Sequence, residues 1–170
     1  MNLLIVRHAI AEERERFATH CDDDRRRPLT EKGRRRMEQG AAGLHRLLPN
    51  LDYLISSPLV RARQTAEILA TRYPAARFLE WPELAPEGRA PQVAERLAKL
   101  PADTTVALVG HEPNLSELIA WLTAGAAFGL LRFKKGGACL LASPSQPVPG
   151  MAELLWALDP KQLRQLGCSE

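Results

Sequence analysis

The stretch Leu3-Leu4-Ile5-Val6-Arg7-His8-Ala9 joins an apolar run to a basic pair. Four consecutive β-formers predict a buried strand over 3–6. In open α/β sheets, ligands bind at the carboxyl ends of strands, which is where Arg7 and His8 stand. An arginine binds phosphate oxygens through a planar fork of donors, and a neutral histidine can act as a nucleophile, a base or a ligand. Taken alone, the dipeptide is more simply explained as a strand-end pair that faces solvent.

Strands and helices alternate along the rest of the chain. Apolar runs predict further strands at 53–55, 77–79, 104–109, 130–133, 138–142 and 152–158. Helical spacing and capping residues predict helices at 30–48, 59–72, 92–100 and 113–122, and a short one from Asp159-Pro160. Segment 9–28 is too polar for the core and predicts a flap over the first strand end, and 80–91 predicts a loop. This order predicts an α/β fold, a three-layer α/β/α sandwich with a mostly parallel central sheet and an antiparallel edge.

Length and composition are those of an ordinary globular protein. The 170 residues fit one domain, which we place at 1–170. No apolar run approaches the length of a membrane span, and no signal peptide precedes the first strand, so we expect no membrane partner. The three cysteines, Cys21, Cys139 and Cys168, fit neither a disulfide framework nor a zinc site. A cytoplasmic location is therefore expected.

The charge balance is weakly basic, with a net charge of +3 and a pI of about 9.0. Acidic and basic residues interleave within 12–16 and 22–27, which is typical of a solvated, salt-bridged surface. These runs contain no interleaved aromatic side chains on which bases could stack. We therefore expect no nucleic-acid partner, and the weak positive charge fits an anionic substrate better.

Two further strand ends carry reactive or phosphate-binding side chains. Arg61 lies in the first turn of the helix that follows 53–57, near free backbone N–H groups. His111 follows the strand at 104–109 and the flexible Gly110. Each has a plainer alternative, a surface arginine or a histidine bonded to a backbone carbonyl. Because the carboxyl ends of parallel strands converge, we expect Arg61 and His111 to join Arg7 and His8 in one crevice.

These blocks together resemble the histidine phosphatase, or phosphoglycerate mutase-like, superfamily. The matching blocks are Arg7-His8, the Leu29-Thr30-x-x-Gly33 helix start, Ser57-Pro58-x-x-Arg61-Ala62-x-Gln64-Thr65-Ala66, and Gly110-His111-x-Pro113. They follow the family order and span about Leu3 to Leu122. The short chain without a large insert is similar to SixA-type phosphohistidine phosphatases. Ala9 departs from the family's more common glycine after the Arg-His pair.

The resemblance implies a metal-independent phosphatase that needs no cofactor. His8 is implied as the nucleophile that forms a covalent phosphohistidine, and Arg7, Arg61 and His111 as the phosphate-binding groups. Positive groups around the equatorial oxygens are what phosphoryl transfer requires, and nearby arginines also favour a neutral His8. The expected substrate is a phosphorylated protein, in particular phosphohistidine, or a small phosphorylated molecule. A phosphomutase of the same fold and a non-catalytic phosphate-recognition module are the alternatives.

Two features around this site stay open at this level. A general acid for an ester leaving group is implied between the second and third blocks, where Glu83 fits better than Glu87, although an exposed loop glutamate is the alternative. The basic turn Lys134-Lys135-Gly136-Gly137 is either near the site mouth or, as we favour, a plain hairpin turn.

Overall fold

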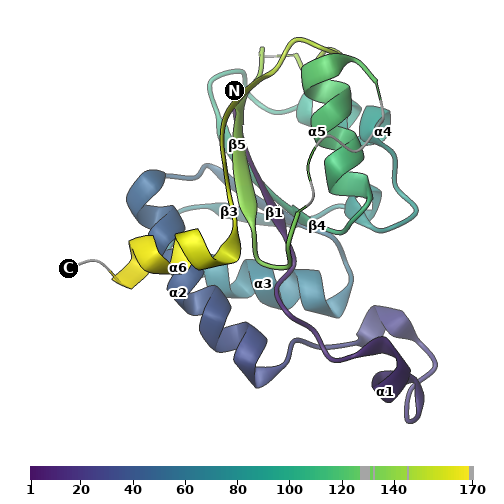
Figure 1. Ribbon diagram of the computed structural model, residues 1–170. Coiled ribbons are helices and arrows are strands. Elements are labelled where there is room, and N and C mark those ends of the chain that lie inside the picture. The colour runs from purple at the N-terminus through teal and green to yellow at the C-terminus, as the bar shows by residue number, and fades with distance from the viewer. Residues whose placement is uncertain (127–130, 132, 145, 169–170) are drawn as a thin grey trace.

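The computed structural model describes residues 1–126, 131, 133–144 and 146–168, and its centre is one six-stranded sheet (Figure 1). The strands are β1 (Asn2–Arg7), β2 (Tyr53–Ser56), β3 (Arg77–Glu80), β4 (Thr105–Gly110), β5 (Ala138–Ala142) and β6 (Glu153–Leu158). Their order is β3-β2-β4-β1-β5-β6. The first four in this order are parallel, β5 pairs antiparallel with β1, and β6 pairs antiparallel with β5, which confirms the predicted mixed sheet.

Helices cover both faces of the sheet, which gives the three layers predicted from the sequence (Figure 1). Their bounds are α1 (Arg14–Ala18), η1 (Asp24–Arg26), α2 (Glu31–Leu47), α3 (Val60–Ala70), η2 (Pro82–Leu84), α4 (Ala90–Leu97), α5 (Asn114–Ala124) and α6 (Pro160–Cys168). One apolar cluster joins the sheet to α2, α3 and α6, and a second joins it to η2, α4 and α5. No helix within the described residues is both long enough and apolar enough to cross a membrane.

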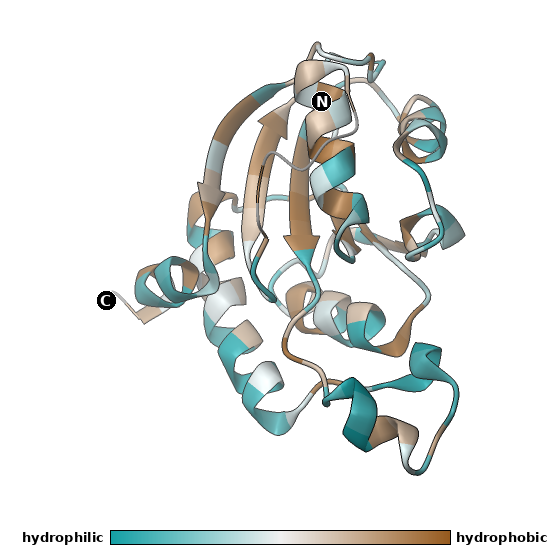
Figure 2. Ribbon diagram, turned by 45° about the vertical axis from the view of Figure 1, so that its right-hand side comes forward, coloured by the Kyte–Doolittle hydropathy of each residue, from teal (hydrophilic) through white to brown (hydrophobic). Residues whose placement is uncertain are grey.

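Strand β1 lies between these two clusters. Leu4 and Val6 pack with the α2–α3 side, and Leu3 and Ile5 pack with the α5 side. A strand that is buried on both faces has to be apolar at every position, which explains the unbroken run at 3–6. In Figure 2 the strands are largely brown, whereas the helices around them alternate between brown and teal. The polar residues therefore begin only where β1 leaves the sheet.

Several predicted boundaries need correction. Segment 9–28 is not wholly outside the core, because Ala9, Ala11 and Phe17 are buried and α1 and η1 form within it. The predicted loop at 80–91 contains η2 and the first turn of α4, which ends at Leu97 rather than at residue 100. Of the predicted strand at 130–133, residues 130 and 132 lie outside the described residues, and Leu131 and Phe133 are not in a strand.

Candidate active site

The structure brings the four predicted side chains together at the carboxyl ends of β1, β2 and β4. Arg7 pairs with Gly110 in the sheet register, and the His8 backbone N–H donates to the Gly110 carbonyl over 3.0 Å. The rings of His8 and His111 lie 5.1 Å apart between centroids. Arg7 and Arg61 are close enough for their charges to act on both histidines. The predicted convergence of these strand ends is confirmed.

His8 is held as a neutral ring with one nitrogen available. Its Nδ1 lies 2.7 Å from the Ala9 carbonyl oxygen, which only accepts, so Nδ1 carries the proton and Nε2 the lone pair. The side chain is buried, and this burial, with smaller effects from His111, Arg61 and Arg7, lowers its pKa from 6.5 to about 2. We expected the arginines to keep His8 neutral, but loss of solvent has the larger effect.

His111 lies against a serine that sequence reasoning did not assign. Its Nε2 is 2.8 Å from the Ser57 hydroxyl oxygen, which also accepts from the Leu59 backbone N–H. When the Ser57 hydroxyl donates to Nε2, the proton of His111 resides on Nδ1, a buried atom with no hydrogen-bond partner among the described residues. Burial first, then Arg61, lowers the pKa of His111 to about 3. His111 is therefore a neutral ring next to His8, and in this tautomer its Nδ1 is a donor.

The two arginines each leave one buried nitrogen unpaired. Arg7 donates through Nη1 to the Phe133 carbonyl, and Arg61 donates through Nη1 to the Asp24 carbonyl over 2.8 Å. The Nε atoms of both arginines are buried and have no hydrogen-bond partner in the described chain. A buried donor without an acceptor costs about 1–3 kcal/mol. Arginine N–H groups of this kind are typical donors to an oxyanion.

Segment 9–28 folds against this site through Asp24. The Asp24 carboxylate contacts Arg27 over 2.7 Å, Arg14 over 3.2 Å and Arg61 over 3.2 Å. Partial burial by itself would raise the pKa of Asp24, but hydrogen bonds from Arg27 and Arg14 and the charge of Arg61 outweigh burial and lower it to about 2. The sequence suggested only a solvated charge run here. The available signal was the spacing of three between Asp24 and Arg27, which matches one turn of η1.

The basic turn at 134–137 also belongs to the site, so its interpretation as a plain hairpin turn is wrong. The Gly136 N–H lies 3.1 Å from both the Arg7 and the His8 carbonyl oxygens, and Gly137 accepts from the Arg7 N–H. Gly136 has a φ of +80°, which glycine adopts without strain. Burial first, and then the charges of Arg7, Arg27 and Arg61, lower the pKa of Lys135. The turn thus supports the Arg7-His8 strand end and adds a cation to it.

The predicted general acid, Glu83, points to a different partner. It lies in η2, and its Oε1 forms an ion pair with Arg96 of α4 over 3.4 Å. Its assignment as an acid stays a prediction, because within the described residues Glu83 pairs with Arg96 and not with any of the four central residues. Glu112 is the carboxyl group whose charge reaches Arg7.

Glu112 was not assigned from the sequence, although it adjoins His111. Burial raises its pKa, and its Oε2 lies 2.5 Å from the Ser116 hydroxyl oxygen, which is also 2.5 Å from the Leu131 carbonyl. One hydroxyl has one proton, so Ser116 can donate to only one of these two acceptors. Burial thus favours the neutral form of Glu112, while Ser116 and the charge of Arg7 favour its charged form.

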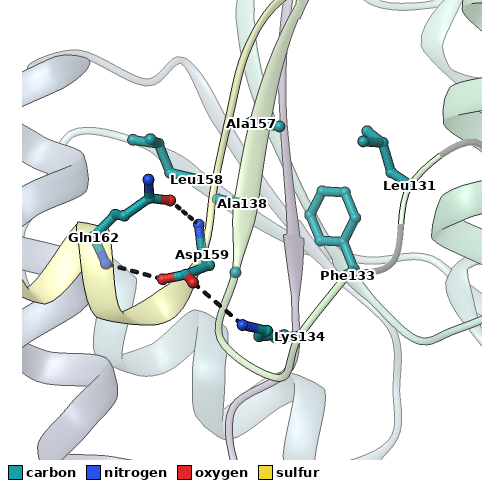
Figure 3. Close-up of a pocket in the computed structure, with 9 residues that line it drawn as sticks. Leu131, Phe133, Lys134, Ala138, Ala157, Leu158, Asp159 and Gln162 are labelled. Carbon is teal, nitrogen blue, oxygen red and sulfur yellow. Dashed lines mark hydrogen bonds and ion pairs between the residues drawn. The ribbon is translucent and has the colours of Figure 1, made fainter.

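A hollow of about 200 Å³ adjoins Arg7 on the β5–β6 side (Figure 3). Its lining residues are Leu131, Phe133, Lys134, Gly137, Ala138, Ala157, Leu158, Asp159 and Gln162. Figure 3 shows Lys134 paired with Asp159 at its rim, over 3.3 Å, and Asp159 capping the start of α6. Because Phe133 and Gly137 also bond to Arg7, the hollow is one residue away from Arg7.

Known proteins match both the sequence and the fold. The family model described as the histidine phosphatase superfamily (branch 1) matches residues 3–86. An uncharacterised protein of Picosynechococcus sp. is 35% identical over 167 residues, which covers 96% of this chain and 99% of that protein. Among solved structures, the protein histidine phosphatase SixA complexed with tungstate has a TM-score of 0.82 at 24% identity, covering 96% of this chain and 99% of that one.

Two further structures define the range of the likeness. A protein of Nakamurella multipartitia that carries the SixA name has a TM-score of 0.77 at 26% identity, with 94% of this chain and 95% of that one covered. A phosphoglycerate mutase from Plasmodium falciparum has a TM-score of 0.66 at 18% identity, with coverages of 91% and 88%, and shows a shared fold. The sequence blocks, the sheet order and these matches agree. The fold supports phosphatase activity through a histidine, and the chain belongs to the histidine phosphatase superfamily as a SixA-like member.

Proposed function

We propose that the protein is a phosphatase that acts through a covalent phosphohistidine on His8. The Nε2 lone pair forms a bond to phosphorus as the bond between phosphorus and the leaving group breaks. Water then attacks the phosphorus, the N–P bond breaks, the electron pair returns to Nε2 and phosphate departs. What supports this order is the hydrogen bond from Nδ1 to the Ala9 carbonyl, which leaves Nε2 unprotonated.

Arg7, Arg61 and His111 bind the phosphoryl oxygens in this proposal. A phosphoryl group in transfer spreads negative charge over three equatorial oxygens, and buried donors stabilise that charge most effectively. The unpaired Nε atoms of both arginines and Nδ1 of His111 supply one buried donor each. Because these donors are fixed by β1, α3 and β4, they need little rearrangement when the charge develops.

We propose phosphohistidine on a protein as the substrate class, with a small phosphorylated molecule as the second option. The likeness to SixA structures supports the first. The chemistry agrees, because the P–N bond of phosphohistidine needs less proton assistance than an ester. Glu83, which is paired with Arg96, is proposed as the proton donor for ester substrates only.

The observation that carries the proposal is the neutral, buried His8 beside buried donors with no acceptor of their own. The test incubates the protein with phosphohistidine, p-nitrophenyl phosphate and sugar phosphates in the presence of a chelator. Wild-type protein should release phosphate and carry acid-labile phosphate during turnover. His8→Gln should lose both, and His20→Gln, an exposed histidine outside the site, should keep both. Full activity of His8→Gln would disprove the mechanism, and phosphopeptide binding without turnover would indicate a recognition module.

A further inference from the structure

Asp24 is the common partner of three arginines. Its Oδ1 accepts from Arg27 Nε over 2.7 Å, and its two carboxylate oxygens accept from Arg14 over 3.3 Å and 3.2 Å. Its Oδ2 lies 3.2 Å from Arg61 Nη2, and its backbone carbonyl accepts from Arg61 Nη1 over 2.8 Å. Two separate atoms of one residue thus hold both terminal nitrogens of Arg61.

This double contact fixes the orientation of the Arg61 guanidinium. The group is planar, so holding Nη1 and Nη2 also sets the direction of its Nε edge. The Arg61 side chain is only 4% exposed, and its Nε is buried without a partner in the described chain. The charge of Arg61 acts on both His8 and His111. The edge of Arg61 that Asp24 leaves unoccupied is therefore the one that remains for a ligand.

The charges around Arg61 show why a carboxylate is needed there. Arg27 and Arg14 both repel Arg61, and Asp24 is the group that attracts it. Because Arg61 is buried, it cannot relieve this repulsion by turning into water. Arg27 is itself tied to Asp24 and to the Glu12 carbonyl, so it cannot move away readily. Without the Asp24 charge, the repulsion from Arg27 and Arg14 would act on Arg61 uncompensated.

We propose that Asp24 is a positioning residue, which holds both Nη atoms of Arg61 so that its Nε edge is presented to the phosphoryl group at His8. The inference rests on the proposed function, since it assigns a task in that reaction to a residue that does not touch the substrate. It also gives segment 9–28 a role, because η1 carries the carboxylate to the site.

The test is a double-mutant cycle between Asp24→Asn and Arg61→Ala, with kcat and KM measured on p-nitrophenyl phosphate. A misplacement of about 1 Å in a catalytic geometry costs on the order of 100-fold. Asp24→Asn should therefore lower kcat by at least about 10-fold, with a smaller change in KM. In the Arg61→Ala background the same substitution should change kcat by less than about twofold, because the side chain that it positions is gone. Asp22→Asn, on an exposed neighbour, should behave as wild type.

Equal losses in both backgrounds, or no loss with Arg61 present, would overturn the proposal. If Asp24→Asn does not fold, Asp24→Glu keeps the charge and moves it by one methylene, and the same dependence on Arg61 is expected. Calorimetric binding of tungstate separates this inference from the proposed function. If the wild type showed no turnover, the proposed function would be refuted. Even then, Asp24→Asn should weaken the binding of tungstate about 10-fold when Arg61 is present, and should not weaken it in the Arg61→Ala background. Unchanged tungstate binding would refute the role of Asp24.

Discussion

Acidification from pH 7 to pH 5 should destabilise the protein through His8 and His111. Their folded-state pKa values are lowered to about 2 and about 3, mainly by burial, whereas an unfolded histidine titrates near 6.5. Below pH 6.5 His8 and His111 bind protons in the unfolded chain, whereas in the folded protein they stay neutral. The stabilisation is thus present above pH 6.5 and is lost as the pH falls toward the folded values.

The magnitude follows from the two histidines. At pH 5 each lies about 1.5 pH units below its unfolded pKa, and one unit is worth about 1.36 kcal/mol, which gives about 2 kcal/mol per histidine. The two together cost about 4 kcal/mol, a large share of the roughly 5–15 kcal/mol that stabilises a typical domain. Glu112, whose pKa is raised by burial, acts in the opposite direction as it takes up a proton in the folded state.

Urea unfolding at pH 7, 6 and 5 measures this effect, with a His8→Gln/His111→Gln double variant as the reference. The remaining histidines and Glu112 are common to both proteins, so their contributions cancel in the difference. Near pH 5 the wild type should lose about 2.7 kcal/mol more per pH unit than the double variant. Parallel pH dependences for the two proteins would refute the assignment of His8 and His111 as buried neutral rings.

Three further outcomes test the site and its support. Ser57→Ala should lower kcat/KM about tenfold, because it leaves the buried Nε2 of His111 without its partner, at a cost of about 1–3 kcal/mol; unchanged kinetics would contradict the contact. Glu83→Gln should slow phenyl phosphate more than p-nitrophenyl phosphate in steady-state assays, since only the poorer leaving group needs a proton, and equal effects would remove Glu83 as the acid. Gly33→Ala should cost about 1–3 kcal/mol in urea unfolding, because its Cβ would lie 2.0 Å from the Ile10 carbonyl oxygen; full stability would contradict this packing.

The sequence predicted those parts of the site that follow directly from strand ends. Arg7, His8 and His111 stand at or just after buried apolar runs, and such runs predict strands reliably. Arg61 follows from the same reasoning, because its helix starts four residues after β2 ends. Local patterning therefore sufficed wherever the site residue and the element that positions it are adjacent in sequence.

The remaining contacts depend on tertiary packing, which no local pattern reports. Asp24 lies 37 residues before Arg61, and Gly136 lies more than 120 residues after Arg7. The charge run around Asp24 is typical of a solvated surface, and it reaches the site only because η1 packs beside α3. The turn around Gly136 was interpreted as a plain hairpin turn because 130–133 was predicted to be a strand. In both cases the local sequence was compatible with a plain surface feature.

Sheet order explains why three separate sequence blocks form one site. Strand β4 lies between β1 and β2, with Arg7 opposite Gly110 and Ser56 opposite Val109. The three strands therefore end at the same edge of the sheet, and the residues that follow them are neighbours in space. Successive residues of a strand point to opposite faces, so a slip of one residue in β1 would move either Arg7 into the place of His8 or His8 into the place of Arg7. Such a slip would place either Asn2 at the fully buried position of Leu3 or Arg7 at that of Val6, so the polar ends of the apolar run oppose it and hold Arg7 and His8 in their places.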